Sequence, residues 1–134
     1  MLVADDDRAP EPAGAERRGF PRLSAACRIR VRPMAGVGPV GEGHEALTVN
    51  ISGSGLCYRS LHALEPGTFV AVELTLPNFA SPVLALARAA YCAPQGPQFD
   101  VGLEFWWVGW GDDSAQRAIG DYIKSELRIR SGEA

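Results

Sequence analysis

The sequence predicts an all-β core, a six-stranded antiparallel β-barrel, with a C-terminal α-helix packed on it. Three observations support this prediction. Between residues 26 and 105, apolar and polar side chains alternate with a period of two, which is typical of strands that bury one face. Turn-forming residues divide this region into six runs, as in small antiparallel barrels and tight sandwiches. After Gly111 the apolar spacing changes to the period of an amphipathic helix.

The first strand is expected at residues 26–32, where three apolar side chains face one way and three arginines face the other. The apolar set is Cys27, Ile29 and Val31, and the arginine set is Arg28, Arg30 and Arg32. Pro33 is expected to end this strand because proline has no backbone N–H. The segment GVGPVGEGH at 36–44 lacks the lysine and the spacing of a phosphate-binding Walker loop, so a flexible hairpin turn is expected.

The other five strands follow in order. The segment EALTVNISGSGLCYRS at 45–60 indicates two short strands joined at a corner, because small residues at 52–55 interrupt the alternation. TFVAVELTL at 68–76 and VLALARAAYC at 83–92 are runs rich in β-formers, separated by prolines. QFDVGLEF at 98–105 buries its apolar residues on one face and is the sixth strand.

The helix is indicated by a single apolar stripe near the C-terminus. Its members are Ala115, Ala118, Ile119, Tyr122, Ile123 and Leu127. Asp113 and Gln116 have the spacing of a capping box at its start. Trp106, Trp107 and Trp110 lie where the last strand meets the helix, which favours core and hinge packing and leaves open an exposed anchor for a partner protein.

Composition and charge limit the organisation and the partners of the chain. With 134 residues, 46% of them hydrophobic, one domain is expected at 16–130, with a disordered N-terminal tail at 1–15 and a flexible C-terminus at 131–134. The net charge is −3, but residues 16–32 carry +5 and the remainder −8. A basic edge on an acidic protein favours a compact anionic ligand over a nucleic acid polymer.

The cysteines, the N-terminal residues and the histidines indicate the cellular compartment and whether the protein is an enzyme. Cys27, Cys57 and Cys92 lie apart in apolar runs, which predicts reduced, buried thiols and no metal site. The acidic N-terminus lacks signal-peptide features, and no apolar run reaches membrane-spanning length, so a cytoplasmic protein without membrane insertion is expected. His44 and His62 are expected in turns without a nucleophile partner, so we predict neither an enzyme nor a cofactor.

Two arginines near the N-terminus could bind an anion. Arg18 and Arg22 are four residues apart, and Pro21 between them excludes a helix, so they are expected to act from a loop. A guanidinium group can chelate a phosphate, pair with guanine O6 and N7, or stack on a base. These properties suit a nucleotide, although arginines before a first strand are also commonly only solvated.

A second polar group follows in the segment NISGSG. Asn50 and Ser52 lie on the same face of a strand that is about to end, so both side chains are expected to point outward. An amide and a hydroxyl can bind a base edge or a phosphate, and Gly55 permits positive φ and close backbone approach. The same residues could equally form an Asx or Ser turn.

Taken together, Arg18-x-x-x-Arg22 and Asn50-x-Ser52-x-x-Gly55 resemble the paired signature of the PilZ domain family, whose members bind the bacterial second messenger cyclic di-GMP. ERRGFPRL at 16–23 and FDVGLEF at 99–105 are also similar to family segments, so that the resemblance covers residues 16–125. It implies a PilZ-type β-barrel with one C-terminal helix.

The resemblance also implies a ligand site. Its residues would be Arg17, Arg18, Arg22, Asn50, Ser52 and Gly55. By analogy with the family, the Arg18 and Arg22 loop would grip phosphates and guanine rings, and Arg17 would add a phosphate contact. Asn50 and Ser52 would hydrogen-bond a guanine, and Gly55 would keep the wall of the site low.

The implied function is that of a non-catalytic cyclic di-GMP receptor, which changes conformation on binding and regulates an unidentified effector protein. Motility, biofilm formation, exopolysaccharide production or virulence would be the regulated process by analogy. The alternative is a ligand-independent PilZ-like adaptor in type IV pilus or flagellar assembly. A domain for single-stranded nucleic acid is disfavoured by the acidic remainder of the chain. Ligand stoichiometry and a homodimer are left open.

Overall fold

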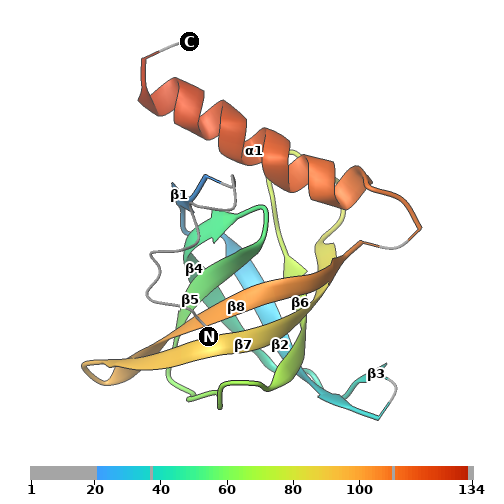
Figure 1. Cartoon of the computed structure of the whole chain (residues 1–134), viewed down its shortest axis with the longest axis vertical. Coiled ribbons are helices and arrows are strands. Elements are labelled where there is room, and N and C mark those ends of the chain that lie inside the picture. Colours follow the sequence, from blue (N-terminus) through green and yellow to red (C-terminus); the bar gives the residue numbers. More distant parts are fainter. Residues whose placement is uncertain (1–20, 37, 110, 133–134) are drawn as a thin grey trace.

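The computed structural model describes residues 21–36, 38–109 and 111–132. The strands are β1 (Leu23–Ser24), β2 (Arg28–Ala35), β3 (Gly38–Pro39), β4 (His44–Ser52), β5 (Gly55–Ser60), β6 (Phe69–Leu74), β7 (Val83–Gln95) and β8 (Gln98–Val108), and the helix is α1 (Ser114–Arg130). The four longest strands, β2, β4, β7 and β8, supply most of the barrel wall, and α1 lies across one end of it (Figure 1).

The sheet closes on itself. Six strands pair in the order β4, β5, β8, β7, β6 and β2, and β2 then pairs with β4 to complete the ring. All of these pairings are antiparallel. The two-residue strands β1 and β3 add to β4 and β2, outside the ring. The predicted six-stranded antiparallel barrel with a C-terminal helix is therefore confirmed.

The core lies inside the barrel and beneath the helix. Alternate residues of each strand are buried there, as Ile29 and Val31 are on β2. The predicted apolar stripe of α1 joins the same cluster: Ala115, Ala118, Ile119 and Ile123 are buried, and Tyr122 and Leu127 pack at its edge. Burial of this stripe against the open end of the barrel stabilises the helix, because its own hydrogen bonds contribute little net stability.

The start of the barrel corrects two predictions. Strand β2 does not end at Pro33 but continues to Ala35, with Pro33 in register with Val70. Pairing between β2 and β4 stops at Val31, so no residue of β4 lies opposite Pro33. The missing N–H of Pro33 therefore does not interrupt the β2–β4 ladder. His44 lies in β4 and not in a turn, because it pairs with Val31. Burial and the nearby His62 lower the pKa of His44.

The start of the helix also differs from the prediction. The side chain of Asp113 makes no capping hydrogen bond. Asp112 does this instead, since its Oδ1 accepts hydrogen bonds from the amide and the hydroxyl of Ser114 at 3.0 and 2.8 Å. Gln116 is consequently available to donate from Nε2 to the carbonyl oxygen of Gly53 at 3.1 Å. This bond ties α1 to the turn between β4 and β5.

The tryptophans do not lie in the core. Trp106 is 61% exposed and Trp107 is 57% exposed, so the expectation of core packing is wrong for both. The register shifts between Leu86 and Ala87 on β7, which makes Trp106 an extra residue of β8 and changes the alternation there. The ring of Trp106 packs edge-on against Phe69, with centroids 5.1 Å apart. Trp110 lies outside the described residues, and a role as partner anchor stays a prediction.

One buried hydroxyl connects the chain entering β2 to strand β4. Thr48 is buried, and its Oγ1 accepts a hydrogen bond from the Cys27 amide at 2.8 Å and donates one to the Ala25 carbonyl oxygen at 2.5 Å. The hydroxyl thus satisfies two backbone groups at a point where the strands do not pair with each other regularly.

We expect Thr48→Val to lower the free energy of unfolding by about 1–3 kcal/mol, because the buried amide of Cys27 loses its acceptor. Urea denaturation followed by circular dichroism measures this. The control is Thr75→Val, which makes the same change at an exposed position and should shift stability by no more than about 0.5 kcal/mol. Equal stability of the two variants would contradict the role of Thr48.

Candidate functional site

The two halves of the predicted site meet through one hydrogen bond. Arg22 Nη1 donates to Asn50 Oδ1 at 2.6 Å, although the residues are 28 apart in the sequence. The contact forms because β1 pairs with the end of β4, with Ser24 opposite Asn50 and Leu23 buried beneath. Arg22 is exposed and Asn50 is half-buried. Arg22 and Asn50 are therefore in direct contact on the barrel, and their role in ligand binding stays a prediction.

The other arginines of the predicted site, Arg17 and Arg18, lie outside the described residues. Their contribution to ligand binding stays a prediction. Arg22 lies one residue before β1 and so marks where the chain carrying them reaches the barrel.

Ser52 does not point outward as expected. Its side chain is fully buried, and its hydroxyl accepts a hydrogen bond from the Ser54 amide at 3.2 Å and lies 3.3 Å from the Gly55 carbonyl oxygen. This is the serine turn that the sequence allowed as an alternative. The turn encloses the hydroxyl because β4 and β5 form a tight hairpin here, with Ser52 opposite Gly55. Its role in ligand binding stays a prediction.

Gly55 is required by the barrel itself. A Cβ atom at this position would collide with the carbonyl oxygen of Leu103 on β8. Its φ is not positive, so the glycine is required here by the close approach of β8 and not by its backbone conformation. Its role in the wall of the ligand site stays a prediction. The absence of a side chain lets β5 and β8 pair at the rim of the site.

Three residues that the sequence analysis missed extend the site. Asn50 pairs with Cys57 on β5, Cys57 with Gly102 on β8, and Gly102 with Tyr91 on β7. These four residues form a cross-strand row over the outer face of the barrel, here called the outer row. Arg22 contacts one end of this row, and Tyr91 forms the other end.

Tyr91 lies in the outer row because of a bulge. The register shifts between Ala89 and Tyr91, so that Ala89 pairs with Leu103 and faces the core, whereas Tyr91 pairs with Gly102 and is 48% exposed. A regular strand would place both side chains on the same face. Alternation alone therefore predicts the wrong face for Tyr91, and the only signal in the sequence was the glycine in FDVGLEF.

The electrostatics of the outer row are dominated by neutral groups. The Tyr91 phenol lies beside the Cys57 thiol, and burial raises the pKa of each. Near the outer row, Arg59 on β5 lies opposite Asp100 on β8 and binds it through two hydrogen bonds of 2.7 and 3.2 Å. The charges of Arg59 and Asp100 offset each other, which leaves Arg22 as the cation that contacts the row directly among the described residues.

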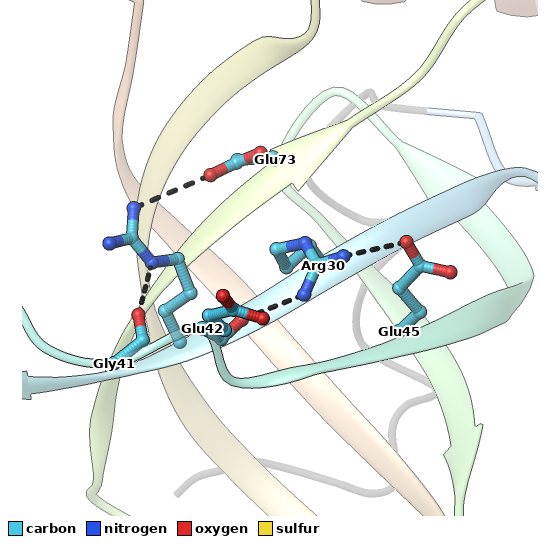
Figure 2. A network of polar contacts seen from close by, with 6 residues as sticks. Arg30, Gly41, Glu42, Glu45 and Glu73 are labelled. Carbon is cyan, nitrogen blue, oxygen red and sulfur yellow. Dashed lines mark hydrogen bonds and ion pairs between the residues drawn. The ribbon is translucent and has the colours of Figure 1, made fainter.

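The arginines of β2 do not form a positive ligand-binding face. Arg30 binds the carboxylate of Glu45 at 2.7 Å and the carbonyl oxygen of Glu42 at 2.9 Å (Figure 2). Arg32 lies 3.5 Å from Glu73 and donates to the Gly41 carbonyl oxygen at 3.0 Å. These side chains brace residues 41–45, and β3 lies at the opposite end of the barrel from β1 (Figure 1). Two of the three arginines on the expected positive face, Arg30 and Arg32, are thus neutralised by glutamates.

Metal-binding clusters and membrane-spanning helices are both absent from the described residues. Within the described ranges, histidine, cysteine, aspartate and glutamate side chains do not gather in groups of three or more that could hold a metal ion. In the same part of the chain, no helix has the length and apolar character needed to cross a membrane.

Comparison with known proteins identifies relatives by family and by fold. A family model described as PilZ domain matches residues 16–125. The inhibitor of motility MotI/DgrA from Bacillus subtilis is 21% identical, with a TM-score of 0.67 over 85% of this chain and 53% of that one. The PilZ domain of YcgR from Escherichia coli, solved with cyclic di-GMP, is 13% identical, with a TM-score of 0.60 over 88% and 99%.

A third similar structure is a tetrameric PilZ-domain protein from Xanthomonas campestris that self-assembles through a helical bundle. It is 20% identical, with a TM-score of 0.51 over 69% of this chain and 50% of that one. No protein in the curated collection matched the sequence. This chain spans about half the length of the Bacillus and Xanthomonas chains.

We expect Gly55→Ala to destabilise the fold by about 1–3 kcal/mol, because the added methyl group must push β5 away from β8. The matched control is Gly120→Ala in α1, where an added Cβ atom meets no other atom within 4 Å. That change should be neutral or stabilise by up to about 1 kcal/mol, since alanine favours helix. Chemical denaturation of both variants measures the difference, and a neutral Gly55→Ala would contradict the close approach.

Proposed function

Because this chain belongs to the PilZ domain family, we propose that it is a non-catalytic receptor for cyclic di-GMP. The observation that carries this proposal is the contact between Arg22 and Asn50, which joins the two halves of the family signature at one point on the barrel. The cyclic di-GMP bound to the YcgR domain, which has the same fold, supports the choice of ligand.

The chemistry of the Arg22 and Asn50 pair suits a guanine nucleotide. The arginine fork can donate two parallel hydrogen bonds to guanine O6 and N7 or to a phosphate. The asparagine amide supplies both a donor and an acceptor for a base edge. Arg22 is exposed and its bond goes to a neutral amide, so an anionic ligand would exchange that bond for a stronger charge-assisted one.

The ligand would act by fixing the chain before β1 against the outer row. Arg18 and Arg17 would then join Arg22 around the phosphates, and the altered surface would bind or release an effector protein. Regulation of motility is one candidate process, because MotI/DgrA is described as an inhibitor of motility. Biofilm formation, exopolysaccharide production and virulence are others. No cofactor beyond the dinucleotide is part of the proposal.

Isothermal titration calorimetry with cyclic di-GMP tests the receptor directly. We expect saturable binding of cyclic di-GMP and weaker binding of cyclic di-AMP, because adenine presents an amino group where guanine presents O6. The same titration gives the stoichiometry. Equal affinity for the two dinucleotides would contradict guanine recognition, and no binding of either would favour the ligand-independent adaptor in pilus or flagellar assembly.

We expect Arg22→Ala to weaken cyclic di-GMP binding at least tenfold, since a charge-assisted hydrogen bond contributes about 1.5–3 kcal/mol. The thermal melt should be nearly unchanged, because the residue is exposed and its bond to Asn50 is at the surface. Arg128→Ala, which removes an exposed arginine from the last turn of α1, is the control and should bind normally. Calorimetric affinity unaltered in Arg22→Ala would remove this residue from the site.

A further inference from the structure

Tyr91 has a position that the proposed receptor function does not explain. Its side chain extends from β7 across β8 toward β5, over Gly102 and up to the thiol of Cys57. Cys57 is the direct cross-strand neighbour of Asn50, so the phenol ends beside the residue that Arg22 binds. About half of the Tyr91 side chain is accessible to solvent.

The Tyr91 ring lies flat against the barrel. A Cβ atom at Gly102 would fall within the ring, with the ring atoms Cε2, Cζ and Cδ2 as its nearest neighbours. The glycine therefore allows the ring to lie directly on the backbone of β8. The far end of the ring lies beside the Cys57 thiol. One face of the ring is thus packed on the strand and the other is exposed.

We propose that the exposed face of Tyr91 is a stacking platform for one purine base of the bound dinucleotide. This inference rests on the proposed receptor function and adds to it a subsite at the β7 end of the outer row. A base stacked there would have its edge directed along the row toward Asn50 and Arg22, which can hydrogen-bond it.

The surroundings of Tyr91 suit a base better than a phosphate. Burial raises the pKa of both the phenol and the thiol, so both groups are neutral at physiological pH. A nearby carboxylate, Asp100, is bound by Arg59 and disfavours a second anion at this end. Stacking on an aromatic ring has little dependence on which base is stacked, whereas hydrogen bonds from Arg22 and Asn50 discriminate. Affinity from Tyr91 and selectivity from Arg22 are therefore separable.

Calorimetry of the full chain with cyclic di-GMP and cyclic di-AMP tests the platform. We expect Tyr91→Ala to weaken binding of both dinucleotides by a similar factor of at least about five, and so to leave the ratio of the two affinities unchanged. Tyr91→Phe keeps the ring and should retain most of the affinity. Trp106→Ala removes an exposed aromatic side chain away from the outer row and should bind as wild type does.

The outcomes separate this inference from the receptor proposal. If wild type binds cyclic di-GMP and Tyr91→Ala binds equally well, the platform is wrong and the receptor stands. If Tyr91→Phe is as weak as Tyr91→Ala, the phenol and not the ring makes the contact, which also overturns the platform. If wild type binds neither dinucleotide, both proposals fail. Thermal melts of the two Tyr91 variants show whether any loss of affinity reflects unfolding.

Discussion

Strand β4 pairs with three other strands, and both the barrel and the candidate site depend on this. Its first residues pair with β2 and close the ring, its later residues pair with β5, and its end receives β1. The pairing with β1 is what brings Arg22 to Asn50. Thr48 lies between these regions and binds the backbone of the crossing segment. The same strand therefore closes the barrel through its first residues and positions the site through its last residues.

The outer row is produced by irregularities in the sheet. Bulges on β4 and β7 place Asn50 and Tyr91 on the outer face, and two glycines allow close packing between them. Gly55 brings β5 onto β8, and Gly102 makes space for the ring of Tyr91. A regular barrel of the same strands would expose ordinary alternating side chains here. Bulges are common beside functional sites because they redirect a side chain without changing the topology.

Much of the fold could be predicted from local patterns, because burial of one face imposes a period that the sequence displays. The six strands and the helix belong to this part, whereas the pairing of the Arg22 and Asn50 motifs was implied by the resemblance to the PilZ domain family. Features set by contacts between distant residues were wrong or missed. The acids that neutralise the β2 arginines come from β4 and β6, and the exposure of Trp106 follows from a register shift. Neither the ion pairs nor the register shift can be predicted from the local sequence.

The two ends of the outer row differ in the conformational entropy that is lost when a ligand binds. Arg22 is a long exposed side chain, and fixing it on a ligand costs conformational entropy that its charged hydrogen bonds must exceed. The Tyr91 ring is already packed on Gly102, so a base that stacks on it costs little additional side-chain entropy. An aromatic face is also less demanding of geometry than a hydrogen bond. The packed aromatic end is thus suited to retaining a base, and the exposed charged end to selecting which base is retained.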